Sequence, residues 1–85
     1  MIRKSMTEHI PVRPLSDFPA GSRIRIVDIE AGRGLKNRLA SLGLLPDAPI
    51  GVIRNDGAGQ VIVSVKNSKI ILGRGMSHKV FCVQQ

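Results

Sequence analysis

Most of this chain consists of five short apolar runs separated by glycine, proline and polar residues, a pattern typical of strands joined by turns. One segment departs from it, because Leu35, Leu39 and Leu42 recur at the spacing of a single helix face. Gly43 is placed to cap that helix, and Pro46 to prevent its continuation. The sequence therefore predicts a mainly β fold in which one short α-helix of about two turns lies between the first and second strands.

The length and the cysteine content limit the size of the fold and the sites that it can hold. With 85 residues the chain is expected to form one domain with a modest core. Cys82 is the only cysteine, which excludes an intramolecular disulfide framework and a four-cysteine zinc site. No apolar stretch approaches the ~20 residues that a membrane span requires, and the first residues lack the apolar segment of a secretory signal. We therefore expect a cytoplasmic protein without direct membrane insertion.

The chain divides into an amino-terminal arm and one domain. Residues 1–13 show neither strand alternation nor helical spacing, and we predict that they form a flexible arm. Residues 14–85 are predicted to form the domain. Its five strands are predicted at residues 22–29, 48–54, 60–66, 69–72 and 80–83, with a tight turn at residues 67–68 and a single helical turn at residues 76–79.

The first predicted strand contains a change of parity. Its apolar residues shift from Ile24 and Ile26 to Val27 and Ile29, whereas side chains in a straight strand alternate with a period of two. Such a shift indicates a β-bulge or a bend, or a strand that is covered on both faces. A curved strand of this kind favours a small barrel.

Three motifs give the domain a resemblance to a known family. Together with the order of strands and helix, they make it similar to the FeoA family, cytosolic proteins of the bacterial ferrous iron uptake system. The resemblance covers about residues 15–83 and implies a small SH3-like barrel of five strands. The motifs are Leu15-Ser-Asp-Phe-Pro-Ala-Gly21 before the first strand, Arg38-Leu-Ala-Ser-Leu-Gly-Leu-Leu-Pro46 at the helix exit, and Ile71-Leu-Gly-Arg-Gly75 before the last strand.

The resemblance also implies a function. FeoA-family proteins work with FeoB, the membrane-embedded, GTPase-linked ferrous iron transporter, by protein contact and not by catalysis. For this chain, the resemblance implies an accessory or adaptor protein that binds the cytosolic region of FeoB at the inner face of the membrane and modulates transport. Four residues depart from the family pattern: Asp47 stands where glycine is usual after the proline, Gln60 where proline is common, Ser77 where alanine is expected, and Cys82 where valine is expected.

Other kinds of site receive little support from the residues. His78 and Cys82 are separated by three residues, but a metal site needs three or four convergent ligands, and the expected change from helix to strand prevents helical facing. No serine, cysteine or lysine has a matched histidine and carboxylate nearby in the sequence. We therefore predict no catalytic residues, no cofactor and no metal site, and an iron(II) or transition-metal sensor stays as one alternative.

The charge of the chain indicates anionic partners without selecting one, because the formal net charge is +7. A basic nucleic-acid-binding accessory module is therefore the second alternative. Phe18 and Phe81 are the only aromatic residues and are expected to be buried, so no platform for base stacking and no specific nucleic acid is predicted. The cations that a positive face would present to phosphates are Arg23, Arg25, Arg54, Lys66 and Lys69.

The helix and its exit are the predicted partner-binding surface. The leucines of the helix are expected to pack inward, while Leu44 and Leu45 either complete the core or form an exposed docking edge. Lys36 and Arg38 are expected to stay outside and, with Arg33, to tune the encounter rate more than the affinity. The surface is also compatible with a weak homo-oligomer. The predicted partner-binding residues are Arg33, Lys36, Arg38, Leu44 and Leu45.

Overall fold

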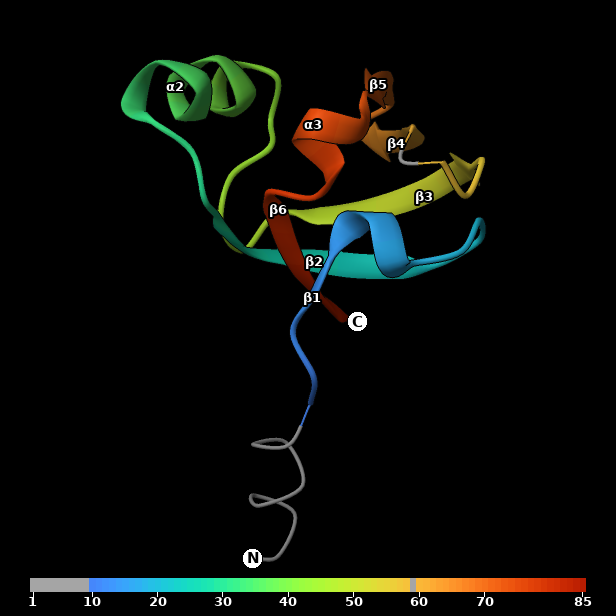
Figure 1. The fold of residues 1–85 in the computed structure, drawn as a ribbon. Helices are drawn as coiled ribbons and strands as arrows, with labels where there is room; N and C mark the ends of the chain where they lie inside the picture. Colours follow the sequence, from blue (N-terminus) through green and yellow to red (C-terminus); the bar gives the residue numbers. More distant parts are fainter. Residues whose placement is uncertain (1–9, 59) are drawn as a thin grey trace, which may run out of the picture.

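The computed structural model describes residues 10–58 and 60–85. Over these residues the chain forms one antiparallel sheet of six strands in the order β1-β6-β2-β3-β4-β5, and α2 stands to one side of it (Figure 1). The strands are β1 (Arg13–Pro14), β2 (Arg23–Ile29), β3 (Pro49–Asn55), β4 (Val61–Val65), β5 (Ser68–Leu72) and β6 (Val80–Gln84). The helical elements are the 3-10 turn η1 (Leu15–Asp17), α2 (Arg33–Ser41) and α3 (Arg74–Ser77).

The mainly β, SH3-like fold class is thus confirmed, but the described residues form six strands and not the five predicted. The additional strand is β1, in which Arg13 pairs with Cys82 and Pro14 with Phe81. Proline has no backbone N–H and cannot donate a hydrogen bond to a further strand, so this short strand fits at the edge of the sheet. Arg13 therefore belongs to the sheet and not to the predicted arm, of which residues 1–9 lie outside the described residues.

The predicted change of parity in the first strand is a β-bulge. Pairing between β2 and β6 passes from Ile26 opposite Cys82 to Asp28 opposite Phe81, so Val27 is the extra residue. Val27 is 42% exposed, whereas Ile26 is fully buried. The bulge bends β2 and lets apolar residues on both sides of it face the core. A second irregularity bends β3 where it pairs with β4.

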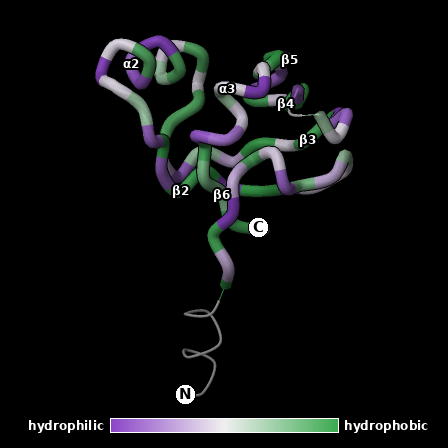
Figure 2. The backbone as a smooth tube through the Cα atoms, viewed as in Figure 1, coloured by the Kyte–Doolittle hydropathy of each residue, from purple (hydrophilic) through white to green (hydrophobic). Residues whose placement is uncertain are grey.

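The core lies inside the curved sheet and is almost entirely aliphatic. Figure 2 shows hydrophobic stretches along β2, β3 and β6, whereas hydrophilic segments recur along α2. Cys82 is fully buried in β6, and this burial raises the pKa of its thiol from 9.0 to about 12. It therefore acts as a small apolar core residue, as its strand position predicted. The buried core consists of Leu15, Phe18, Ile24, Ile26, Ile29, Leu39, Leu44, Ile50, Val52, Val61, Val63, Val65, Leu72, Val80 and Cys82.

The outer strands β1 and β5 are not paired with each other within the described residues, so η1 and α3 close the barrel between them (Figure 1). The side-chain amide of Asn55, at the end of β3, donates to the carbonyl oxygens of Ser16 (2.9 Å) and Phe18 (2.8 Å). The hydroxyl oxygen of Ser16 lies 2.9 Å from Nδ1 of His78, which follows α3. Side-chain hydrogen bonds, and not a strand ladder, therefore join this side of the molecule.

The hairpin between β4 and β5 turns one residue earlier than predicted. Lys66 and Asn67 both have positive φ, +48° and +69°, which is the geometry of a type I′ turn with two central residues. Val65 and Ser68 then form the last pair of the ladder. α3 also begins two residues earlier than the predicted helical turn, because the carbonyl of Gly73 accepts its first hydrogen bonds. Neither α2 nor α3 is long and apolar enough to cross a membrane.

Candidate partner-binding surface

The exit of α2 is built on a C-terminal capping motif. The amide of Gly43 donates to the carbonyl oxygen of Ala40, and the amide of Leu44 donates to that of Leu39, both at 2.9 Å. This is the Schellman arrangement, and Gly43 has the left-handed φ of +96° that it requires, which confirms the predicted cap. A Cβ at position 43 would lie 3.3 Å from Cγ2 of Val65, so the exit approaches the end of β4 closely.

The cap determines which leucines are buried. The residue after the capping glycine commonly packs against the last turn of the helix. Accordingly, Leu44 and Leu39 both join the core, with 0% and 2% of their surfaces exposed, and Leu35 packs against it partly buried. Leu42 is 47% exposed, although its spacing predicted inward packing. That expectation is wrong because the helix ends at Ser41, and the chain turns at Leu42 and the following glycine away from the helical face.

The buried position of Leu44 corrects its place among the predicted contact residues. Its side chain completes the core, which was the alternative reading, and presents no surface to a partner. Leu45 is 45% exposed and stays a candidate contact residue, and the structure adds Leu42, which is 47% exposed. The sequence contains a signal that Leu44 is buried, because the residue after a capping glycine commonly packs against the last turn of the helix.

A turn with Asp47 at its third position holds Leu45 at the surface. The amide of Ala48 donates to the carbonyl oxygen of Leu45 (3.0 Å), and Pro46 occupies the second position, where proline is favoured. Asp47 has a φ of +76°, a conformation in which glycine carries the least strain and aspartate is tolerated. Its amide donates to the carbonyl oxygen of Ile26 at 2.7 Å. This bond fixes the turn to β2.

A mostly apolar hollow of about 170 Å³ lies between α2 and β2. The buried residues Ile29 and Leu44 contribute to its floor, while Lys36 and Asp28 bring one charge of each sign to its rim. This volume is below that of pockets for drug-sized ligands, so it suits one apolar side chain of another protein. The hollow is lined by Asp28, Ile29, Lys36, Asn37, Ala40, Leu44, Leu45 and Pro46.

The three predicted rim cations, Arg33, Lys36 and Arg38, are all exposed on α2. None of them forms an ion pair within the residues that the structure describes. Arg33 lies in the first turn of α2, which holds no acidic residue, although the helix dipole favours acidic side chains there. Helix stability therefore does not explain this charge, which stays available for contact with another molecule.

The geometry offers no metal centre in residues 10–58 and 60–85, where no three His, Cys, Asp or Glu side chains are grouped to hold an ion. His78 is exposed and hydrogen-bonded to Ser16, whereas Cys82 is buried in β6, so these two residues do not converge. Within the same residues, no hydrogen bond joins His78 to a carboxylate, as a catalytic triad would need. The contact of Ser16 with His78 therefore serves the closure of the barrel.

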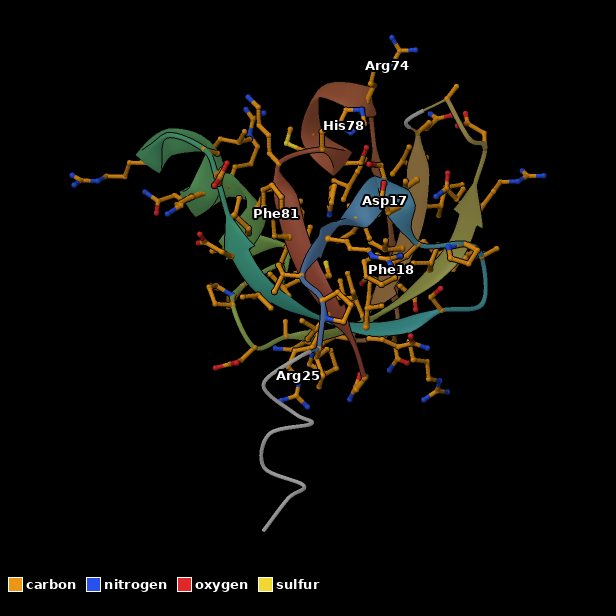
Figure 3. The ribbon with its side chains drawn as sticks, turned by 60° about the horizontal axis from the view of Figure 1, so that its bottom comes forward. Asp17, Phe18, Arg25, Arg74, His78 and Phe81 are labelled. Carbon is orange, nitrogen blue, oxygen red and sulfur yellow. The ribbon has the colours of Figure 1, made fainter. Side chains whose placement is uncertain are left out.

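A basic region of the sheet lies away from this closure. Figure 3 shows Arg25 pointing away from the barrel on the side opposite to Arg74 and His78.

Phe18 is buried, with 8% of its surface exposed, but Phe81 is only half-buried, so the expectation that both aromatic residues are buried is wrong for Phe81. Phe81 is partly exposed because it alternates in β6 with the buried Val80 and Cys82 and so lies on the outer side of that strand.

Comparisons with known proteins agree in sequence and in fold. The model of the FeoA domain family matches residues 13–84. The "Putative Fe(2+) transport protein A" of Methanocaldococcus jannaschii is 39% identical over 67 residues, which cover 79% of this chain and 80% of that protein. The crystal structure of an iron uptake regulatory protein (FeoA) has 31% identity and a TM-score of 0.81, covering 88% of this chain and 100% of that one. A manganese-dependent transcriptional repressor, 23% identical, shares the fold with a TM-score of 0.77 over 89% of this chain and 43% of its own.

Proposed function

This chain belongs to the FeoA domain family, and on that premise we propose that it is a cytoplasmic accessory protein of ferrous iron uptake that binds the cytosolic region of the FeoB transporter. The family model spans residues 13–84, which supports assigning the proposed role to the described domain as a whole. The proposed action is binding, which modulates transport or the nucleotide cycle of the partner, and not catalysis. The curated relative carries the name of a ferrous iron transport protein, which supports the iron-uptake role.

The proposed contact is the exit surface, which we define as Leu42, Leu45, Arg33, Lys36 and Arg38. The observation that carries it is the pair of leucines, each nearly half exposed, on either side of the buried leucine that anchors the helix exit. Side chains of this kind are favourable anchors when a partner excludes water from them. Leu45 also lines the hollow between α2 and β2, which receives an apolar side chain of the partner.

The charges around these leucines set the kind of partner surface that fits. Three exposed cations lie along α2, so the complementary surface on the partner combines an apolar side chain with acidic residues along the helix. Covering the exposed halves of Leu42 and Leu45 contributes about 1 kcal/mol each, because full burial of a leucine is worth about 1.5 to 3 kcal/mol. Modulation then requires that one conformation of the transporter binds this surface better than another.

A binding titration with the purified cytosolic region of the cognate FeoB tests the proposal. The double variant Leu42→Gln and Leu45→Gln should weaken binding roughly 10- to 30-fold, as expected for about 2 kcal/mol. The matched control is Ile53→Gln, because Ile53 of β3 is 42% exposed but lies outside the exit surface. A chain that does not bind FeoB at all contradicts the partner. Undiminished binding of the double variant contradicts the surface.

A second variant tests the role of the rim. Replacing Arg33, Lys36 and Arg38 by glutamine should slow association and flatten its dependence on salt, while the dissociation rate changes little. Stopped-flow or surface plasmon resonance measurements at two salt concentrations separate these rates. A change confined to the dissociation rate would show that the cations act as buried anchors and not as a rim.

A further inference from the structure

A row of basic and small residues crosses four strands on the outer face of the sheet. By strand register, Arg23 of β2 lies opposite Gly51 of β3. Gly51 lies opposite Ser64 of β4, which in turn lies opposite Lys69 of β5. Because neighbouring strands are about 4.8 Å apart, two cations flank a floor of small residues across roughly 14 Å. Arg23, Gly51 and Ser64 line a shallow groove of about 280 Å³, and Lys66 of the β4–β5 turn lines it as well.

The positive charge of this face is almost unopposed. In the strands β2, β3, β4 and β5 themselves the one carboxylate side chain is Asp28, which lies beyond the bulge of β2 and lines the hollow beside α2. Asp47 and Asp56 lie in the turns before and after β3. None of the five cations on the face forms an ion pair within residues 10–58 and 60–85. We call this region the basic sheet face, and its cations are Arg23, Arg25, Arg54, Lys66 and Lys69.

Exposed isoleucines lie beside these cations on the same face. Ile71 of β5 is 63% exposed, the largest fraction of any large apolar side chain in the described residues. It lies opposite Ile62 of β4, and the bulged pair of Ile53 and Arg54 in β3 opposes Ile62 from the other side. Positions two apart in a strand share a face, so Ile71 lies on the face of Lys69. An aliphatic row therefore runs next to the basic row.

We propose that the basic sheet face binds the surface of an anionic phospholipid bilayer. The cations lie against the headgroup phosphates, and Ile71 and Ile53 enter the interfacial region. Charge complementarity selects an anionic surface. The aliphatic row can contact the apolar part of the bilayer interface, whereas phosphate groups alone offer it no apolar contact. This is peripheral binding at the headgroup level and requires no helix that spans the bilayer.

The mixture of cations and isoleucines favours a lipid surface over a nucleic acid. A phosphodiester backbone contacts the cations alone and leaves Ile71 in water, while unpaired bases stack on aromatic side chains, which β2 to β5 lack. The β2 side of the face is directed away from α2, since Arg25 projects at the bottom of Figure 3, whereas α2 lies at its upper left. Lipid binding through this side leaves the exit surface open to a membrane-embedded partner, and it does not depend on the proposed contact with FeoB.

Sedimentation with large unilamellar vesicles tests this proposal on the full chain. We compare vesicles of phosphatidylcholine alone with vesicles that contain about one third phosphatidylglycerol, at about 50 and 150 mM salt. Binding is expected only to the anionic vesicles, weaker at the higher salt. The variant Arg23→Gln, Arg25→Gln and Lys69→Gln should lower the partition coefficient roughly 100-fold, at about fivefold for each cation. Ile71→Ser should lower it severalfold without any change of charge.

The control variant removes the same number of charges from α2, through Arg33→Gln, Lys36→Gln and Arg38→Gln. It should retain most of the vesicle binding, whereas the sheet variant should retain FeoB binding in lipid-free solution. Absence of binding to anionic vesicles overturns the proposal, and so does an equal loss in the α2 control, which indicates bulk charge. Displacement by millimolar inorganic phosphate indicates a site for free phosphate. Binding to duplex DNA that matches vesicle binding and ignores Ile71→Ser indicates a nucleic-acid surface, and either result overturns a lipid contact.

Discussion

The α-helices α2 and α3 lie outside the sheet, and different contacts attach them to the barrel. α3, together with η1, fills the gap between the outer strands, where Asn55 and the pair of Ser16 and His78 join the segments by side-chain hydrogen bonds. α2 is held by its cap and by two buried leucines, and it keeps two further leucines at the surface. Side-chain hydrogen bonds therefore hold the segments around α3, whereas α2 leaves charged and apolar groups for another molecule.

Removal of the leucine that anchors α2 should give the largest effect on stability. Leu44→Ala should lower the free energy of unfolding by about 2 to 5 kcal/mol, because the side chain is fully buried and the cavity refills only in part. Urea denaturation at constant pH measures this difference. The control Leu45→Ala should lower it by less than about 1 kcal/mol. Equal losses in the two variants would contradict the division between anchor and surface leucine.

Loss of the hydrogen bonds at the closure should have the next largest effect. Asn55→Ala removes two bonds to backbone carbonyls and one from the amide of Gly57, and should lower the free energy of unfolding by about 1 to 3 kcal/mol. Amide hydrogen exchange should rise in η1 and around α3, while protection in α2 falls only by the global loss. A selective loss of protection in α2 would show that the stabilities of α2 and of the segment around α3 are coupled.

A pair of glycine variants in α2 should change stability in opposite directions. Gly43→Ala should lower the free energy of unfolding by about 1 to 2 kcal/mol, since position 43 has a φ of +96° and a Cβ meets Val65 at 3.3 Å. Gly34→Ala lies within the helix, and its Cβ meets nothing within 4 Å, so it should raise stability by about 0.5 to 1 kcal/mol. Thermal unfolding of both proteins, followed by circular dichroism, tells whether the cap or the helix interior limits α2. A Gly43→Ala variant as stable as the unmodified chain would refute the cap's role.

The smallest effect on stability is expected at the exit surface itself. Leu42→Gln should leave the free energy of unfolding within about 0.5 kcal/mol of the unmodified chain, because its side chain is 47% exposed. The same variant should weaken partner binding, which separates a functional leucine from a core leucine. A loss above about 2 kcal/mol would place Leu42 in the core and remove it from the exit surface.

The parts of the fold that follow from local pattern were predictable from the sequence. The parity change at Val27 predicted the bulge, Gly43 predicted the helix cap, and the alternating valines of β4 predicted a strand with one buried face. Each of these signals lies within a few neighbouring residues. The elements that depend on distant partners were missed, since β1 consists of two residues that become a strand only by pairing with β6.

The candidate site was predicted only in part, because exposure depends on where the chain turns after the helix. Spacing alone placed Leu42 inside with Leu39, and left Leu44 undecided. In the structure, which contains the capping hydrogen bonds, Leu42 is exposed and Leu44 is buried. The three cations of α2 were placed correctly outside, since a polar helix face needs no tertiary partner. The alignment of Arg23 with Lys69 across four strands depends on register, which the sequence pattern does not give.

The central claim is that α2 presents its exposed leucines to a protein partner, and methyl resonances report on those side chains directly. The measurement is a titration of the methyl-labelled chain with the cytosolic region of FeoB in lipid-free solution, followed by nuclear magnetic resonance. The account predicts shifts or broadening at Leu42 and Leu45, with the methyl groups of Ile71 unchanged. Binding that perturbs Ile71 and leaves both leucines unchanged would contradict it, as would the absence of any change.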